Sequence, residues 1–256
     1  MKTVEAVCIG VGEIGEPLFE LISGVCETIP IDPVKYPENI DIELLCEFMH
    51  IAIPGNLTHF CDIVIEYIKK HIPKFVIIHS TVIPGTTNKL NQFCRDYNLD
   101  TVVVHSPVNG KHANNQMKRD LLYYTKMVGV PKLKSDSLKS LCEHFEKIGF
   151  KYVVFENPCT TEWAKILSTT YFGMIIAFHQ EIERICDWFD IKFEDVVYIF
   201  PELKDIQPPH YSGVIGGHCV MPNIELAKKI YDSKLLNWIE ESNNLKKELI
   251  DGTTDI

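Results

Sequence analysis

The sequence has no continuous apolar run of about 18 residues, so it offers no candidate membrane-spanning helix. Its first residues, MKTVEAVCIG, lack the apolar core and the small-residue cleavage site of a signal peptide. Basic residues are fewer than acidic ones, and the formal net charge is −10. This charge disfavours a nucleic acid partner and favours a small molecule or a protein. We therefore expect a cytoplasmic protein that binds neither membranes nor nucleic acids.

Paired cysteines are also missing. The nine cysteines are scattered along the chain, their number is odd, and no two of them form a CxxC pair. This pattern disfavours a disulfide framework and a zinc site, and it fits a reducing compartment. His59, His71 and His179 have no partners at metal-ligand spacing either, so we expect no metal. The sequence shows no internal repeat and no low-complexity segment.

What the sequence does contain is typical of a globular α/β protein. Apolar residues make up 46% and charged residues 23% of the sequence, which is normal for a globular protein. Its length of 256 residues is enough for one large domain or two ordinary ones. Short apolar runs alternate with helical patterns in the first part of the chain. The predicted strands are residues 4–10, 27–32, 48–54, 74–80, 101–107, 125–130 and 151–156. Such alternation predicts a Rossmann-type, doubly wound and mostly parallel sheet.

After Pro158 the pattern becomes helical only. About 30 residues follow without a proline, and their apolar side chains cover more than one helical face. Such a helix needs burial on several sides, so we predict a homodimer, because isologous pairing is the commonest solution. The sequence thus predicts a Rossmann domain at 1–157 and a helical domain with one long helix at 158–256. The charged residues 240–256 are expected to fray or to stay solvated.

A glycine loop follows the first predicted strand. Gly10, Gly12 and Gly15 have the spacing G-x-G-x-x-G between a strand and a helix, which is the context in which this motif binds a dinucleotide. Asp32 ends the second strand, 20 residues after Gly12, where an acid would bind the ribose hydroxyls. No arginine follows it, so the pattern favours NAD over NADP. A structural turn in a fold that binds no cofactor is the alternative.

Several stretches resemble the UDP-glucose/GDP-mannose dehydrogenase family. They are CIGVGEIGEPL, AIP, HSTVIPGTT, HSP, TEWAKILSTTYFGMIIAFHQEIERIC and SGVIGGHCVMPN, and they follow one another in the family's order along nearly the whole chain. The resemblance implies an NAD domain, a central helix used in dimerisation and a small-molecule substrate. It also implies a short form of the family that lacks the C-terminal sugar-nucleotide domain. The expected cofactor-binding residues are Gly10, Gly12, Glu13, Ile14, Gly15, Asp32, Pro54, Ser80 and Thr81.

The resemblance also assigns catalytic positions. Enzymes of this family oxidise an alcohol to a carboxylate with two NAD, through a thiohemiacetal and a thioester on a cysteine. Cys219 falls on that nucleophile, in a glycine-rich turn, and Lys165 falls on the lysine that stabilises the oxyanion. His218, beside Cys219, could lower the pKa of the thiol. The alternatives are that Cys219 is a packed small hydrophobe and that Lys165 is a surface lysine.

Three positions depart from the family pattern. Val108 stands where the family usually has a glutamate, Thr169 aligns with an asparagine, and Asn223 replaces the acid that helps activate the hydrolytic water. Cys219, Lys165, Thr169 and Asn223 are the candidate catalytic residues. Asn109, Lys111 and His112, at the end of the fifth predicted strand, offer an alternative polar site, and His112 is the first candidate for a substitute base.

Three functions therefore remain open at this stage. The first is an NAD-dependent oxidoreductase acting on an alcohol or aldehyde group. The second is a relative of the β-hydroxyacid dehydrogenases, which share the Rossmann-plus-helical layout and use a lysine, so that Cys219 would be dispensable. The third is a non-catalytic NAD-binding protein, favoured by the missing acids and disfavoured by the joint presence of Cys219 and Lys165.

Overall fold

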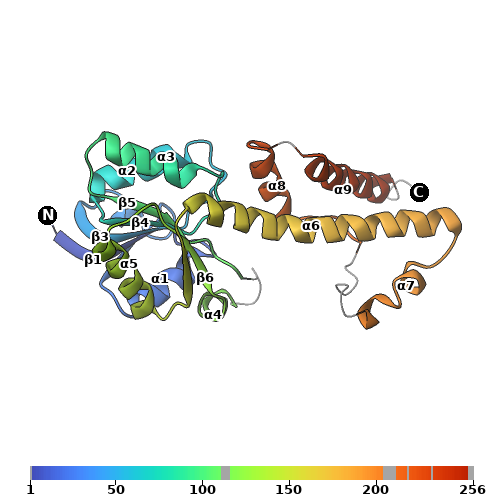
Figure 1. Cartoon of the computed structure of the whole chain (residues 1–256), viewed down its shortest axis with the longest axis horizontal. Helices are drawn as coiled ribbons and strands as arrows, with labels where there is room; N and C mark the ends of the chain where they lie inside the picture. Colours follow the sequence, from blue (N-terminus) through green and yellow to red (C-terminus); the bar gives the residue numbers. More distant parts are fainter. Residues whose placement is uncertain (1, 111–115, 204–211, 218, 232, 253–256) are drawn as a thin grey trace. The chain divides into compact units, whose positions relative to one another are not determined.

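The computed structural model describes residues 2–110, 116–203, 212–217, 219–231 and 233–252 (Figure 1). The chain has two compact units, Met1–Lys165 and Ile166–Ile256. The long helix α6, Pro158–Phe189, contributes its first turns to the first unit and its remainder to the second. The assignment of 1–157 to cofactor binding and of 158–256 to a helical domain remains a prediction.

The first unit is built on a sheet whose strands follow the order β2-β1-β3-β4-β5-β6-β7. All neighbouring strands are parallel except β5 and β6. The strands are β1 Lys2–Ile9, β2 Thr28–Ile31, β3 Leu44–Ile51, β4 Phe75–Ile78, β5 Val102–His105, β6 Lys126–Gly129 and β7 Tyr152–Phe155. Each corresponds to one of the predicted strands, which confirms the α/β fold with a mostly parallel sheet.

Helices cover both faces of this sheet (Figure 1). One core includes residues of α2 (Phe60–His71) and α3 (Thr86–Asp96), and the other includes residues of α1 (Gly15–Ser23), α4 (Met117–Tyr123) and α5 (Ser135–Ile148). Strand β4 illustrates how the sheet contributes to both cores. Val76 and Ile78 belong to the first core and Phe75 and Ile77 to the second, because successive side chains of a strand point to opposite faces. A strand buried on both faces reads as a continuous apolar run.

The strand order creates a switch point between β1 and β3. From β1 the chain forms β2 on one side, and β3 to β7 lie on the other. Ligands of open α/β sheets bind outside the carboxyl ends of the strands at such a point. The glycine loop follows β1 directly, so the predicted cofactor motif occupies this position. A short 3-10 helix, Pro37–Asn39, lies in the connection from β2 to β3.

The second unit is helical. Besides its part of α6 it contains α7 (Phe193–Val196), a 3-10 turn (Phe200–Glu202), α8 (Val220–Lys228) and α9 (Lys234–Gly252). Helix α8 packs closely on α6 at Gly173, where an added Cβ would lie 2.7 Å from Val220 Cγ1. The predicted long helix is confirmed. Among the described residues, no helix is long and apolar enough to cross a membrane.

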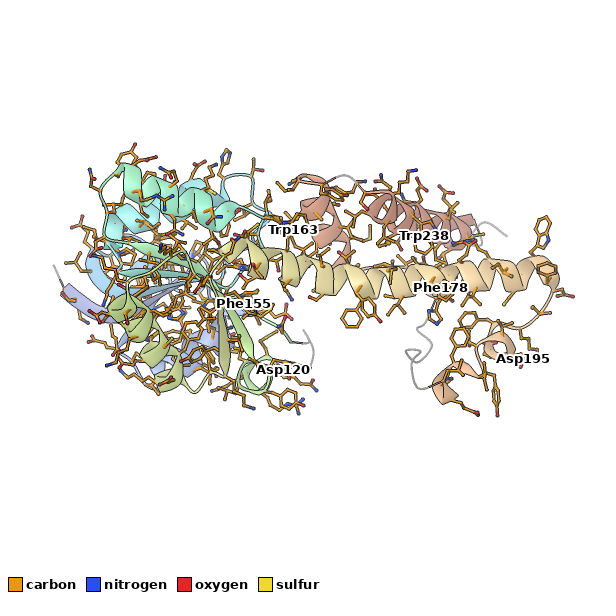
Figure 2. The ribbon with its side chains drawn as sticks, viewed as in Figure 1. Asp120, Phe155, Trp163, Phe178, Asp195 and Trp238 are labelled. Atoms are coloured by element: carbon orange, nitrogen blue, oxygen red, sulfur yellow. The ribbon has the colours of Figure 1, made fainter. Side chains whose placement is uncertain are left out.

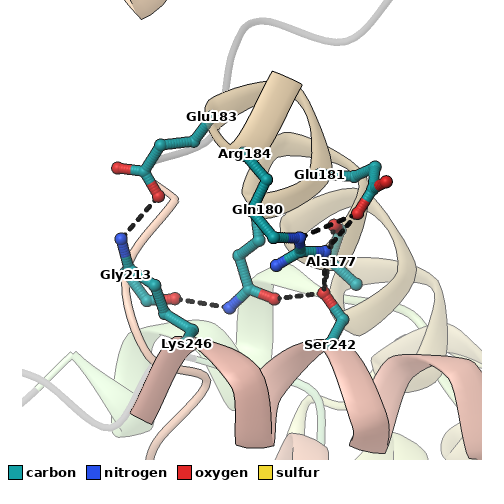
Figure 3. A network of polar contacts seen from close by, with 8 residues as sticks. All are labelled: Ala177, Gln180, Glu181, Glu183, Arg184, Gly213, Ser242 and Lys246. Atoms are coloured by element: carbon teal, nitrogen blue, oxygen red, sulfur yellow. Dashed lines mark hydrogen bonds and ion pairs between the residues drawn. The ribbon is translucent and has the colours of Figure 1, made fainter. Parts of the chain in front are cut away.

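Residues 240–252 belong to α9 and so are not frayed, whereas most side chains of 241–250 are exposed to solvent, as expected. Ser242 Oγ donates a hydrogen bond to Gln180 Oε1 at 2.8 Å, and Gln180 Nε2 donates one to the Gly213 carbonyl at 2.8 Å (Figure 3). Lys246 pairs with Glu183 beside this network. The segment is charged overall, but one of its faces carries small polar groups that pair with α6, and composition alone does not show this.

Candidate functional site

The three glycines of the loop after β1 differ in what surrounds them. Gly10 has φ +84°, and a Cβ there would lie 2.9 Å from the Ala52 carbonyl oxygen. A Cβ on Gly15 would lie 1.9 Å from the Gly10 carbonyl oxygen. A Cβ on Gly12 would meet no atom within 4 Å. The fold thus requires Gly10 and Gly15, whereas Gly12 leaves open space next to the backbone, where the motif would place a pyrophosphate.

Asp32 is fixed beside this loop by backbone donors. Its Oδ2 accepts a hydrogen bond from the Val11 N–H at 2.8 Å, and its Oδ1 accepts from the N–H groups of Val34 and Lys35 at 2.9 and 3.0 Å. Partial burial opposes ionisation, but these donors outweigh it and lower the pKa of Asp32. A carboxylate has about four acceptor sites, so Asp32 can still accept hydrogen bonds from a ligand's hydroxyl groups.

The other predicted cofactor residues lie on loops in contact with each other. Ser80 Oγ donates a hydrogen bond to the Ile53 carbonyl at 2.5 Å, next to Pro54. A Cβ on Gly55 would lie 1.9 Å from the Thr81 carbonyl oxygen. Since Gly10 also approaches Ala52, the loops after β1, β3 and β4 meet at one edge of the sheet. The structure therefore brings the predicted cofactor residues together, although their role stays a prediction.

Behind these loops lies His105, which sequence reasoning quoted within HSP but gave no role. Its Nε2 donates to the Ser80 carbonyl at 3.1 Å, and its Nδ1 is 2.8 Å from Thr161 Oγ1. Burial lowers the pKa of His105 to about 4, and the positive charges of Lys126 and Lys165 act in the same direction. The ring is therefore neutral and ties β5 and the start of α6 to the Ser80 loop.

Glu162, also on α6, holds the STVIPGTT segment. Its carboxylate accepts hydrogen bonds from the N–H of Gly85 at 2.6 Å and from the N–H and hydroxyl of Thr87 at 2.9 and 2.6 Å. Burial raises the pKa of Glu162, and these donors oppose the rise. Because the carboxylate sits at the N-terminus of α3, it also satisfies backbone donors that the helix leaves unpaired. We assign Glu162 a structural role.

Lys126, the first residue of β6, carries no signal in the sequence that marks it as special. It is 3% exposed, and its Nζ has no hydrogen-bond partner within the described part of the chain. The ammonium lies 5.1 Å from the centroid of the Phe150 ring. Burial lowers the pKa of Lys126 to about 7, and the charge of Lys165 contributes. A buried lysine without an anionic partner destabilises the fold when it is protonated.

We expect Lys126→Met to raise the free energy of unfolding by about 2–4 kcal/mol at pH 6, since the lowered pKa outweighs the contact with Phe150. Between about pH 7 and 10.5 the unfolded chain binds a proton on Lys126 that the folded chain does not bind. Wild-type stability therefore rises with pH in this window, and the variant's advantage shrinks. Denaturant unfolding at pH 6, 8 and 10 measures this. Exposed Lys132→Met is the control, and an equal gain in both variants would contradict the explanation.

In the second unit, three of the predicted catalytic residues lie on α6 and at the start of α8. Asn223 Nδ2 donates a hydrogen bond to Thr169 Oγ1 at 2.7 Å, and the Asn223 N–H donates to the Cys219 carbonyl at 3.2 Å. Asn223 is buried, and Cys219, which precedes α8, is partly exposed. Lys165 lies one helical turn before Thr169 on α6, in the first unit.

Some predicted residues lie outside the described part of the chain. They are His218, Lys111 and His112.

Comparison with known proteins adds to this geometry. Residues 159–253 match the sequence profile of the UDP-glucose/GDP-mannose dehydrogenase family, central domain. Over these residues the chain resembles the central domain of that family. A curated relative, the UDP-N-acetyl-D-mannosamine dehydrogenase of Methanococcus maripaludis (strain C7), is 24% identical over 257 residues, which are 95% of this chain and 57% of the relative. The chain thus spans little more than half the length of this relative.

Solved structures agree on the fold. The UDP-D-ManNAc dehydrogenase of Pyrococcus horikoshii has a TM-score of 0.81 at 16% identity, over 97% of this chain and 70% of that one. The 3-hydroxyisobutyrate dehydrogenase of Mycobacterium tuberculosis has a TM-score of 0.66 at 11% identity, over 98% of this chain and 94% of that one. This chain therefore shares its fold with dehydrogenases of two different classes.

The structure shows the surroundings of Val108, which stands where the family usually has a glutamate. Val108 is 4% exposed and belongs to the core that includes Phe75 and Phe145. A carboxylate there would need desolvation and a partner. In this chain the position therefore serves packing.

Proposed function

We propose that the protein is an NAD-dependent oxidoreductase that acts on an alcohol or aldehyde group of a small, sugar-nucleotide-like substrate. One observation carries the proposal: the loop after β1 has open space at Gly12 beside the ionised Asp32, while Gly10 and Gly15 are required by packing. The names of its curated relatives support the substrate class. Residues of the Gly10–Gly15 loop would hold the pyrophosphate, and Asp32 the ribose. NAD, when bound, would accept a hydride.

The second unit offers the nucleophile. Cys219 is partly exposed, and as a thiolate it could attack an aldehyde carbon. The Lys165 ammonium would stabilise the negative oxygen that forms. The Thr169 hydroxyl donates to the Ile166 carbonyl at 3.1 Å and accepts from the Asn223 amide. Neither group ionises near neutral pH, so this pair can orient a substrate or a water molecule but cannot serve as a general base.

We expect calorimetry to show tighter binding of NAD than of NADP, and Asp32→Ala to weaken NAD binding by about 10- to 100-fold, because hydrogen bonds to a charged group are lost. Asp41→Ala is the control, because Asp41 is an exposed acid in the same connection between β2 and β3. Thermal unfolding of both variants will separate a loss of ligand from a loss of fold. Equal wild-type affinity for the two cofactors would refute the assignment of Asp32.

A second candidate function is a β-hydroxyacid-dehydrogenase-like reaction that depends on Lys165. It is favoured by the match to the 3-hydroxyisobutyrate dehydrogenase fold, which covers 94% of that chain. In this reaction Cys219 would be dispensable. The two candidates share the cofactor site and differ in the second unit, so substitution of Cys219 distinguishes them.

We also propose that two copies of the chain associate through α6. Large apolar side chains remain exposed on this helix, among them Phe172 at 51% and Trp188 at 84%. Phe178, labelled in Figure 2, is 51% exposed. An exposed apolar surface of this kind is typical of an interface. Light scattering should give the mass of a dimer at micromolar concentration. A monomer under these conditions would contradict the proposal.

A further inference from the structure

Three buried histidines of the first unit form a hydrogen-bonded chain. His144 Nε2, from α5, lies 2.9 Å from His50 Nε2, and His50 Nδ1 lies 2.9 Å from His79 Nε2. His79 Nδ1 in turn lies 2.9 Å from the Ser106 carbonyl oxygen. All three rings are 3% exposed or less. This row of histidines runs from α5 through β3 and the residue that follows β4 to the residue that follows β5.

The Ser106 carbonyl determines which nitrogen of each of the three histidines carries the proton. A carbonyl only accepts, so His79 Nδ1 must carry the proton, and in a neutral imidazole the other nitrogen then accepts. His50 Nδ1 must therefore donate to His79, and His144 Nε2 must donate to His50. This order leaves a lone pair on His144 Nδ1. That atom is buried and has no hydrogen-bond partner within the described part of the chain.

Two side chains of types that can ligate a metal lie beside His144. Glu5 lies on β1, and Cys26 follows α1. One ligand atom from each of Glu5, Cys26 and His144 lies within 4.8 Å of the other two. Cys26 and His144 are buried, and Glu5 is partly exposed. One sulfur, one nitrogen and one carboxylate oxygen form a ligand set that suits Zn²⁺. Ligand atoms around tetrahedral zinc lie about 3–4 Å apart, as follows from bond lengths of about 2.0–2.3 Å, so small side-chain rotations would complete the set.

The histidine chain also supplies what a metal-binding histidine needs. Such a residue donates its second N–H to an acceptor, which fixes the tautomer and the ring orientation. His144 does this towards His50, and the Phe48 ring stacks on it with a centroid distance of 3.6 Å. The ring thus cannot turn without breaking both contacts. A buried nitrogen with no partner, held in place next to a thiol and a carboxylate, requires an explanation.

We propose that Glu5, Cys26 and His144 bind a divalent transition metal ion of the Zn²⁺ type, with a fourth position left for water. Binding removes the proton of the Cys26 thiol, which is released to solvent, while His144 Nδ1 uses its existing lone pair. The site joins β1, the end of α1 and α5. It does not depend on the proposed cofactor site or on Cys219.

Lys147 competes with the ion. Its Nζ donates to Glu5 Oε1 at 2.6 Å, and the lysine side chain is 45% exposed. Glu5 also makes a side-chain hydrogen bond with Cys26, which metal binding would replace, and Lys147 can move into solvent when the ion binds. Because the two cations repel each other, replacement of Lys147 by methionine should tighten metal binding.

The test is titration of the chelator-treated full-length protein with Zn²⁺ by calorimetry and with Co²⁺ by absorption spectroscopy. We expect one ion per chain, a thiolate-to-Co²⁺ charge-transfer band, and a rise of about 5 °C or more in Tm with excess Zn²⁺. Cys26→Ser should abolish the band and weaken Zn²⁺ binding by about 100-fold or more. Cys142→Ser, on the same helix as His144, is the matched control and should behave as the wild type does.

Two further variants keep the proposal falsifiable if Cys26→Ser folds poorly. Glu5→Gln should weaken Zn²⁺ binding, and Lys147→Met should strengthen it, by about 10-fold each. Absence of saturable binding to the wild type would overturn the proposal. So would an unchanged Co²⁺ band in Cys26→Ser, or an affinity that does not respond to Lys147→Met.

Discussion

Gly15→Ala will destabilise the first unit by about 3 kcal/mol or more, whereas Gly12→Ala will leave its stability nearly unchanged and weaken NAD binding by about 10- to 100-fold. The added methyl group is the same in both variants, and only its surroundings differ. At position 15 it would lie 1.9 Å from the Gly10 carbonyl oxygen, so the turn between β1 and α1 must open. At position 12 it would enter open space, which only a bound ligand would fill.

Urea unfolding and NAD calorimetry on both variants give the two readouts. Gly24→Ala is a suitable control at the end of α1, because a Cβ there would meet only ordinary contacts at 3.4 Å. If Gly12→Ala bound NAD as the wild type does, the pyrophosphate would not approach this loop. A large loss of stability in Gly12→Ala would mean that protein atoms fill the space.

The sequence predicts the glycine loop well because all of its determinants are local. Gly10, Gly12 and Gly15 lie within six residues. The central strand β4 is a continuous apolar run because both of its faces are buried. The reversed direction of β6 was not predicted. It depends on how the chain returns to the sheet after α4, and no residue pattern encodes this.

Contacts between residues far apart in the sequence were also not predicted, because no local residue pattern encodes them. His50, His79 and His144 each look like an ordinary strand or helix residue, and their hydrogen bonds join positions up to 94 residues apart. Glu5 and Cys26 likewise have no metal-ligand spacing, so the expectation of no metal rested on sequence neighbours alone. The family resemblance did select Thr169 and Asn223 separately, and the structure adds that they share a hydrogen bond.

That hydrogen bond bears on the last chemical step. Oxidation of an alcohol to a carboxylate through a thioester requires two hydride transfers and then hydrolysis. Cys219 and Lys165 could support the hydride steps, but hydrolysis requires a base, and the Thr169–Asn223 pair contains none. Val108 is packed in the core at the other position where the family has an acid. Loss of a general base typically costs about 10²–10⁴-fold in rate.

We therefore expect the wild type, given NAD and a panel of alcohols, aldehydes and UDP-sugars, either to stop after one oxidation or to use a base outside the family pattern, with His112 as the first candidate. Asn223→Asp should speed release of the carboxylate product by about 100-fold, since the new acid would lie beside the Thr169 hydroxyl. Cys219→Ser should lower activity by about 1,000-fold or more. Product analysis by mass spectrometry, with NADH counted per product, measures each step.

The outcomes separate the candidate reactions. If Cys219→Ser kept full activity while Lys165→Met lost it, the β-hydroxyacid-type reaction would replace the thiol-dependent one. If His112→Ala abolished carboxylate release by the wild type, the substitute base would be identified, because Cys219 and Lys165 would remain to support the hydride steps. Efficient release of a UDP-uronic acid by the wild type, with two NADH per turnover and no effect of His112→Ala, would show that the protein hydrolyses the thioester without either acid or His112, and our interpretation of Val108 and Asn223 would be wrong.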